Sequence, residues 1–151
     1  MPFWDQLKQN VSQMNNSLQT NVSKFKNTDF ANASMAMCAL IAAADGSIDS
    51  SERQKTTALI VSNETLKIFP SSELKEKFDF YCDKLSQDFD FGKVEAIQAL
   101  AKLNKKADQG RAIIQIGIII GGADGNFDRD EKKVVKEACH AVGIKPEEFD
   151  L

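Results

Sequence analysis

The chain is poor in the residues that build disulfides, zinc sites and histidine-based catalytic centres. It has 3 cysteines and 1 histidine in 151 residues. Cys38, Cys82 and Cys139 are far apart and odd in number, so they form neither a disulfide framework nor a zinc pattern. We expect them to pack in the core of a protein from a reducing cytoplasm. The single histidine, His140, has no nucleophile near it in the sequence and is expected at the surface.

Long hydrophobic runs are also absent. The longest run, AIIQIGIIIGGA at 112–123, has 12 residues and contains Gln115, whereas a membrane-spanning helix needs about 20 apolar residues. The first residues are polar and weakly charged, without the ordered basic and apolar regions of a signal peptide. We therefore expect a cytoplasmic protein without a membrane span.

An excess of positive charge is the third absence. The chain has 19 basic and 22 acidic residues and a net charge of -3, and it lacks the basic face of a nucleic-acid binder. Phosphate-binding glycine loops and redox cofactor motifs are missing as well. These absences exclude nucleic acid as a partner and predict a non-enzymatic protein. The densest basic patch is expected to be a solvated helix face and consists of Lys102, Lys105, Lys106 and Arg111.

The residues that are present predict one all-α domain. The composition is 42% hydrophobic and 27% charged, within the range of globular proteins. No segment alternates apolar and polar residues over the length of a strand, whereas helical spacings of three and four recur along the whole chain. We expect a single-domain bundle of about seven helices.

The first expected helix covers residues 1–26 and packs on or flanks the helical domain that follows it, residues 27–151. Its apolar residues form one narrow stripe. The opposite face has few lysines or arginines, so docking on the domain or on a partner is favoured over binding to lipid. The stripe consists of Trp4, Leu7, Val11, Met14, Leu18 and Phe25.

Six further helices follow from apolar spacing and from capping residues. They are expected from about 28 to 44, 50 to 62, after Pro70, after a cap at Asp90, over the apolar run that ends near Gly122, and from 128 to 142. The inner face of the helix after Pro70 is predicted as Leu74, Phe78, Tyr81, Cys82 and Leu85. The inner face of the helix after Asp90 is predicted as Val94, Ile97, Ala101 and Leu100 or Leu103.

Two acidic turns are nearly identical, ADGSIDSSE at 44–52 and ADGNFDRDE at 123–131. Subtracting 45 from 124 gives an offset of 79, and apolar and small residues before the turns correspond at the same offset. Cys38 and Ala42 match Gly117 and Gly121, and such small residues allow helix backbones to approach closely. The sequence therefore predicts a duplicated helix-turn-helix, over about 28–62 and 107–142, with a pseudo-twofold relation.

The acids of these turns have two interpretations, and the first is helix capping. Asp49 with Glu52, and Asp128 with Glu131, have the spacing of a capping box. This interpretation leaves Asp45 and Asp124 unexplained, because an acid near the C-terminal end of a helix is mildly unfavourable.

The second interpretation is a metal site. The string DGSIDSSE matches the second half of a calcium-binding EF-hand loop, but Ile41 and Ala43 stand where the first half needs ligands, which excludes a true EF-hand. Three carboxylates per turn still suit a hard cation, Ca²⁺ or Mg²⁺. The candidate ligands are Asp45, Asp49, Glu52, Asp124, Asp128 and Glu131.

The chain resembles the TerB family of bacterial tellurite-resistance proteins over essentially its full length. The resemblance is carried by FWDQLKQNV, ALIAAADGSIDSSERQK, FDFGKVEAIQAL, IGIIIGGADGNFDRDEKKVV and GIKPEEFDL. It implies a cytoplasmic all-α domain with a repeated helical unit and a metal site at the six acids above. It also implies membership of a cluster of stress and tellurite-resistance proteins, with the integral membrane protein TerC as a partner.

Three hypotheses for function remain open at this point. The first is a divalent-metal-binding interaction domain that works with a membrane-bound resistance complex at the inner face of the membrane. The second is a thiol-based tellurite handler that uses the three cysteines. The third is a metal-independent adaptor whose acids only cap helices.

Overall fold

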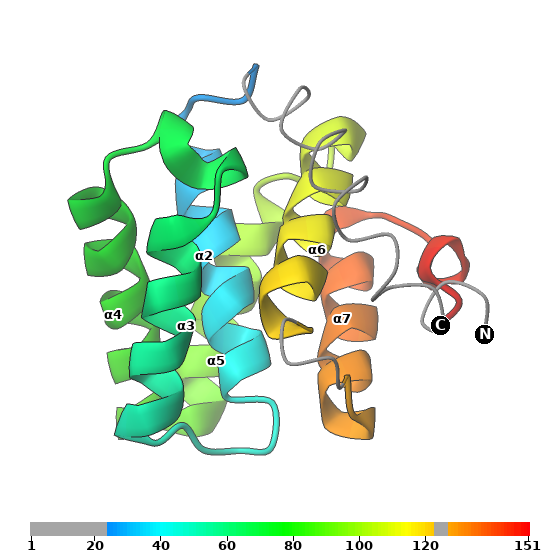
Figure 1. The fold of residues 1–151 in the computed structure, drawn as a ribbon. Helices are drawn as coiled ribbons and strands as arrows, with labels where there is room; N and C mark the ends of the chain where they lie inside the picture. Colours follow the sequence, from blue (N-terminus) through cyan, green and yellow to red (C-terminus); the bar gives the residue numbers. More distant parts are fainter. Residues whose placement is uncertain (1–23, 123–126) are drawn as a thin grey trace.

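The computed structural model describes residues 24–122 and 127–151, and these residues form an all-helical fold (Figure 1). The prediction of an all-α protein is confirmed, since no strand occurs in these two ranges. The α-helices are α2 (Thr28–Ala42), α3 (Ser50–Ser62), α4 (Ser71–Gln87), α5 (Phe89–Ala101), α6 (Ala107–Gly121) and α7 (Arg129–Val142), and two short 3₁₀ helices are η1 (Thr65–Ile68) and η2 (Pro146–Phe149).

The helix count over the described ranges is six rather than the expected seven. The additional helix was expected over 1–26, and residues 1–23 lie outside the described part of the chain. Residues 24–26 are not helical, so the expected end of that helix at 26 is wrong. Phe25 instead packs on the start of α2, with its ring centroid 5.4 Å from that of Phe30.

The central element is α2, which packs against α4, α5 and α6 (Figure 1). Nearly every side chain from Phe30 to Ile41 is buried, as expected for a helix that is apolar on all sides. Its start is fixed by Asn27, whose side-chain oxygen accepts a hydrogen bond of 2.9 Å from the Phe30 N–H. This confirms the cap expected at 27–29.

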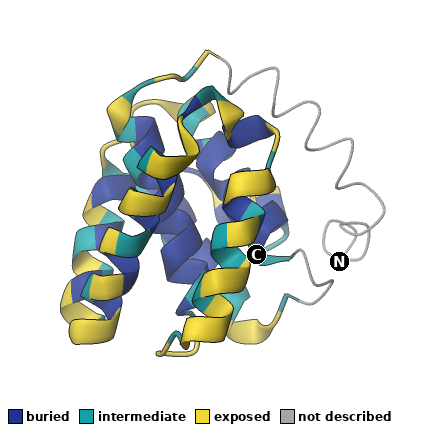
Figure 2. Ribbon diagram, turned by 60° about the vertical axis from the view of Figure 1, so that its left-hand side comes forward, coloured by how far each residue is buried: buried dark blue, intermediate teal, exposed yellow. Residues whose placement is uncertain are grey.

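The other helices bury the faces that meet inside the bundle and expose their outer faces (Figure 2). All five inner-face residues predicted for α4 are buried, which confirms the interpretation of that helix. No helix within 24–122 or 127–151 is long and apolar enough to cross a bilayer.

The predicted inner face of α5 is confirmed at Leu100, and Leu103 is buried as well, but the prediction is wrong at Val94. The helix begins one residue before Asp90, and its cap is Asp88, which accepts a hydrogen bond of 3.1 Å from the Phe91 N–H. Val94 is 53% exposed. A Cβ added at Gly92 would lie 2.6 Å from the backbone nitrogen of Leu85, so the close contact of this glycine with α4 sets the rotation of α5. The residues that α5 buries are Gly92, Ala96, Ala99 and Leu100.

Glycines also allow α6 to pack closely on α2, as predicted from the small residues. A Cβ added at Gly117 would lie 2.7 Å from Cγ of Met37, and one at Gly121 would lie 2.5 Å from Cγ2 of Ile41. The matching residues of α2, Cys38 and Ala42, have a different role, because both line a pocket.

The bounds of the two predicted repeat units agree with the offset of 79. Subtracting 28 from 107, 42 from 121 and 50 from 129 gives 79 each time. Their packing differs, however, because α3 buries only Ile60 and lies against α4, whereas α7 buries five residues and lies against α5 and α6. The duplication and the pseudo-twofold axis are not confirmed and stay predictions.

Candidate functional site

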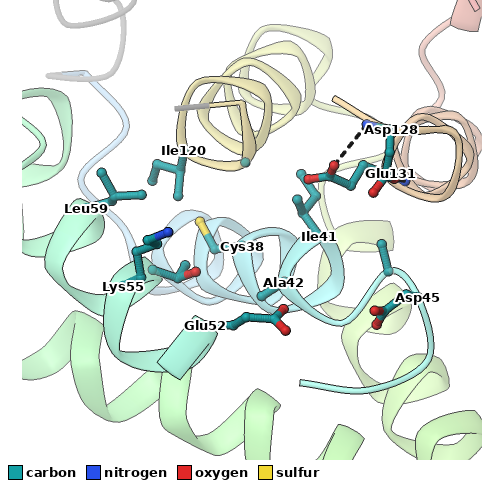
Figure 3. Close-up of a pocket in the computed structure, with 13 residues that line it drawn as sticks. Cys38, Ile41, Ala42, Asp45, Glu52, Lys55, Leu59, Ile120, Asp128 and Glu131 are labelled. Carbon is teal, nitrogen blue, oxygen red and sulfur yellow. Dashed lines mark hydrogen bonds between the residues drawn. The ribbon is translucent and has the colours of Figure 1, made fainter. Parts of the chain in front are cut away.

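The loop after α2 and the N-terminal end of α7 border one pocket of about 430 Å³ (Figure 3). Its walls come from α2, α3, α6 and α7. Much of the lining is apolar, and the small side chains of Cys38 and Ala42 leave room between α2 and its neighbours. The lining consists of Cys38, Ile41, Ala42, Ala44, Asp45, Glu52, Lys55, Thr56, Leu59, Ile120, Gly121, Asp128 and Glu131.

Four of the six predicted ligand residues line this pocket. Asp45 and Glu52 come from the first acidic turn, and Asp128 and Glu131 come from the second, so the fold brings carboxylates of both turns to one place (Figure 3). Asp49 lies beside Glu52 but is not part of the lining. Asp124 belongs to residues 123–126, which lie outside the described part of the chain.

The first turn gives Asp45 a structural role that the capping interpretation did not include. The chain leaves α2 through Gly46, whose φ of 98° is a left-handed conformation that favours glycine. One carboxylate oxygen of Asp45 accepts hydrogen bonds from the Ser47 backbone N–H at 3.1 Å and from its hydroxyl at 3.5 Å. Asp45 therefore stabilises the turn without any ion.

The first turn also places three acids close together. The Glu52 N–H donates a hydrogen bond of 2.7 Å to Oδ1 of Asp49, which caps α3. Partial burial raises the pKa of the Glu52 carboxyl, and so do a side-chain hydrogen bond with Asp49 and the negative charges of Asp49 and Asp45, whereas the positive charge of Lys55 lowers it. A raised carboxyl pKa is the usual result of crowding like charges.

The second turn ends in a complete capping box, as the spacing predicts. The Glu131 N–H donates to Oδ1 of Asp128 at 2.8 Å, and the Asp128 N–H donates to Oε1 of Glu131 at 3.0 Å. Both acids also lie at the positive end of the α7 dipole, which stabilises them. The capping prediction is confirmed in full for α7. For α3, one of the two bonds of a capping box is present, the bond from the Glu52 N–H to Asp49.

Replacing Asp128 with alanine should lower the free energy of unfolding by about 0.5–2 kcal/mol, because α7 would lose its N-cap. Urea unfolding followed by circular dichroism measures this loss. Asp130→Ala is the matched control, because Asp130 is an exposed acid in the same first turn that is not the cap. Equal losses in the two variants would show that charge near the helix end, rather than the cap bond, stabilises α7.

Metal binding depends on how closely these carboxylates approach one another. Within the ranges 24–122 and 127–151, no three side chains of His, Cys, Asp or Glu are grouped closely enough to hold a metal ion. The four carboxylates around the pocket are nevertheless hard oxygen donors of the kind that Ca²⁺ and Mg²⁺ prefer. The chemistry of these carboxylates fits such an ion, but in the structure they lie around the pocket and not close together.

The three cysteines are buried, as expected. Burial raises the pKa of Cys82 and of Cys139 to about 12 each, and it raises the pKa of Cys38 as well. A thiolate is the reactive form of cysteine. Buried thiols with such pKa values are unreactive at neutral pH, which disfavours the thiol-based hypothesis.

Several pocket residues were not predicted from the sequence. Lys55, Thr56 and Leu59 all come from α3. Leu59 is four residues from Lys55 and three from Thr56, and these spacings are the signal that it shares a face with each of them. Lys55 is the only base among the lining residues described, so the pocket combines an apolar wall, four acids and one lysine.

The amino-acid sequence is similar to those of known proteins. Residues 31–151 match the family described as tellurite resistance protein TerB. The tellurium resistance protein TerB of Alcaligenes sp. is 29% identical over 118 residues, which cover 78% of this chain and 97% of that protein. No solved structure matches the chain. The range matched by the family includes both acidic turns and every residue that lines the pocket.

Proposed function

The chain belongs to the TerB family of tellurite resistance proteins, and we propose that it acts in resistance as a non-enzymatic interaction domain whose acidic pocket binds a divalent cation. The observation that carries this proposal is the meeting of Asp45 and Glu52 with Asp128 and Glu131 around one pocket. Segments far apart in the sequence supply these acids, so local capping alone does not require them to meet.

A cation would relieve the repulsion among these acids. The pKa of Glu52 is raised by partial burial first, and then by the hydrogen bond with Asp49 and the negative charges of Asp49 and Asp45. A bound positive charge stabilises the ionised form of a carboxylate. Carboxylate oxygens favour Ca²⁺ or Mg²⁺ over softer metals. The proposed ligands are Asp45, Asp49, Glu52, Asp124, Asp128 and Glu131.

The proposed partner is a membrane-embedded resistance protein of the TerC type, together with other proteins of the resistance cluster. Tellurite itself is an oxyanion, and an acidic pocket repels it unless a bound cation lies between them. An apolar wall beside a charged rim instead suits a protein segment that inserts apolar side chains. We place this interaction in the cytoplasm, at the inner face of the membrane.

A metal-independent adaptor is the second candidate, and the hydrogen bonds of the turns favour it. Asp45, Asp49, Asp128 and Glu131 each accept a hydrogen bond from a backbone N–H. Each acid thus has a structural partner without an ion. In this case the pocket binds its protein partner directly.

A titration of the chelator-stripped protein with Ca²⁺ and then with Mg²⁺ distinguishes the two candidates. We expect the amide NMR signals of Gly46 and Gly125 to shift saturably, because both glycines directly follow proposed ligands. Asp45→Asn combined with Asp128→Asn should weaken binding by at least about tenfold, since removing charged ligands lowers the affinity of a Ca²⁺ site.

Asp130→Asn is the matched control for this titration, because it removes one acid of α7 that does not line the pocket. Its affinity for the cation should remain close to that of the wild type. If no signal shifts up to millimolar ion, the cation-binding proposal is refuted and the adaptor is supported.

A further inference from the structure

The outer face of α7 carries a continuous row of basic side chains. Along an α-helix, residues at i, i+3, i+4, i+7 and i+11 share one face. The residues at these positions of α7 are Arg129, Lys132, Lys133, Lys136 and His140, whereas the residues that α7 buries are Val134, Val135, Ala138, Cys139 and Val142. We call the first four of these residues, Arg129, Lys132, Lys133 and Lys136, the basic face.

A shallow hollow lies along the basic face. It has a volume of about 390 Å³, and all four residues of the basic face line it. Asp130 and Leu151 complete its lining. The side chains that line it are four bases, one acid and one leucine, so this surface carries positive charge on a chain whose net charge is -3. The densest basic patch in the sequence, around Lys102, does not line this hollow.

Most basic residues on the neighbouring helices have an acidic partner, and Arg129, Lys133 and Lys136 of the basic face differ from them. In the ranges 24–122 and 127–151, no acid lies within 4 Å of the charged atoms of Arg129, Lys133 or Lys136. Such charges remain available to an external anion. Acids lie within that distance of Arg53, Lys75, Lys77, Lys84, Lys93 and Arg111.

The acidic pocket lies on the other side of the same helix. Glu131 lines the pocket between α7, α6 and α2, while Lys133 and Lys136 are exposed on the outer side. Figure 1 shows α7 at the edge of the bundle, and the described elements that pack against it are α2, α5, α6 and η2. The helix thus separates an acidic pocket from a basic surface.

We propose that the basic face binds directly to a bilayer surface that contains anionic lipids. Clusters of four or more lysines and arginines on a helix are attracted to such a surface. The convex side of a single helix presents its charges to a plane, and Arg129 and Lys136, seven residues apart, span about 10 Å along the axis. This inference goes beyond the proposed function, because it requires neither a divalent ion nor a protein partner.

The other residues that line the hollow favour lipid over nucleic acid and over a protein segment as the ligand. Binding of single-stranded nucleic acid combines bases with aromatic side chains that stack, and the hollow contains none. Protein interfaces rely on buried apolar or aromatic anchors, and Leu151 is the only apolar residue in this lining. With the basic face on a bilayer, the acidic pocket lies on the far side of α7.

Co-sedimentation with vesicles tests this proposal with the full chain in the presence of a chelator. The wild type should bind phosphatidylcholine vesicles that contain phosphatidylglycerol, and not vesicles of phosphatidylcholine alone. Binding should weaken as salt is added, because salt screens exposed charges. Lys133→Glu with Lys136→Glu should lower the partition constant at least about 25-fold, since each basic residue near such a surface contributes roughly fivefold.

Lys102→Glu with Lys105→Glu is the matched control, because it changes the net charge equally at two exposed residues outside the hollow. It should retain most of the binding. Lys133→Gln with Lys136→Gln should give an intermediate loss, and thermal unfolding confirms that each variant is folded.

Three results would overturn the proposal. The first is failure of the wild type to bind the anionic vesicles at low salt. The second is an equal loss of binding in the control variant. The third is binding to polyglutamate but not to the anionic vesicles, which would assign the basic face to an acidic protein. All three are independent of the cation titration, because a chelator is present throughout.

Discussion

Replacing Phe78 with alanine is expected to lower the free energy of unfolding by about 3–5 kcal/mol. Phe78 is fully buried in α4, which packs against α2 and α5 in the centre of the bundle. Removing its ring loses the free energy of burial and leaves a cavity that the surrounding helices only partly fill. Since single domains are stable by about 5–15 kcal/mol, this loss is a large part of the total.

Phe80→Ala is the matched control for this experiment. Phe80 is on the same helix and is 49% exposed. Its contacts are an edge-on packing against Tyr81 at 5.1 Å and Lys84 above its ring at 5.5 Å, which are worth about 0.5–1.5 kcal/mol. Urea unfolding of both variants should show a clearly larger loss for Phe78. Similar losses would mean that α4 is rotated from the orientation described here.

Replacing Gly92 with alanine is expected to destabilise the protein by about 1–3 kcal/mol, as overpacking usually does. Helix propensity alone predicts the opposite sign, a gain of roughly 1 kcal/mol. The difference arises because the new Cβ would lie 2.6 Å from the Leu85 nitrogen and 2.6 Å from the Lys84 carbonyl carbon. These are backbone atoms, so α4 and α5 must move apart to accommodate the methyl group.

Val94→Ala controls for the effect of propensity at a nearby site in α5. Val94 is 53% exposed, so its replacement should change the stability by a few tenths of a kcal/mol, because alanine is the better helix former. Thermal and urea unfolding measure both variants. A gain in stability for Gly92→Ala would show that α4 and α5 are not in the close contact described here.

Local interactions explain why several elements could be predicted from the sequence. Asn27, Asp49 and Asp128 cap the helices that they were expected to cap, because a cap is a bond between residues two or three positions apart. Gly143 ends α7 with a φ of 75°, for a similarly local reason.

The inner face of a helix could be predicted where its apolar residues lie on one side only. In α4, five apolar or aromatic residues recur on one side and all are buried. In α5, apolar residues occur on more than one side, and the contact of Gly92 with the backbone of α4 decides which side faces inward. Gly92 has no side chain and gives no apolar signal in the sequence, so the prediction found Leu100 but wrongly placed Val94 on the inner face.

The candidate site was predictable in part. The sequence identified the acidic turns and the family they indicate, because these depend on residue types at fixed spacings. It did not predict that Asp45 is bound by Ser47, or that Lys55 and Leu59 of α3 line the pocket. The metal assignment stays a prediction.

By itself, the sequence determined the helical class, most helix ends, the acidic turns and the family, because each depends on residues within about one or two helical turns of each other. Only the tertiary structure decided which carboxylates meet around the pocket, how α5 is rotated, and that Arg129, Lys133 and Lys136 of α7 face outward without acidic partners in the described residues. The physical reason is that these features depend on the packing of whole helices against one another, and spacing within one helix does not specify its neighbours.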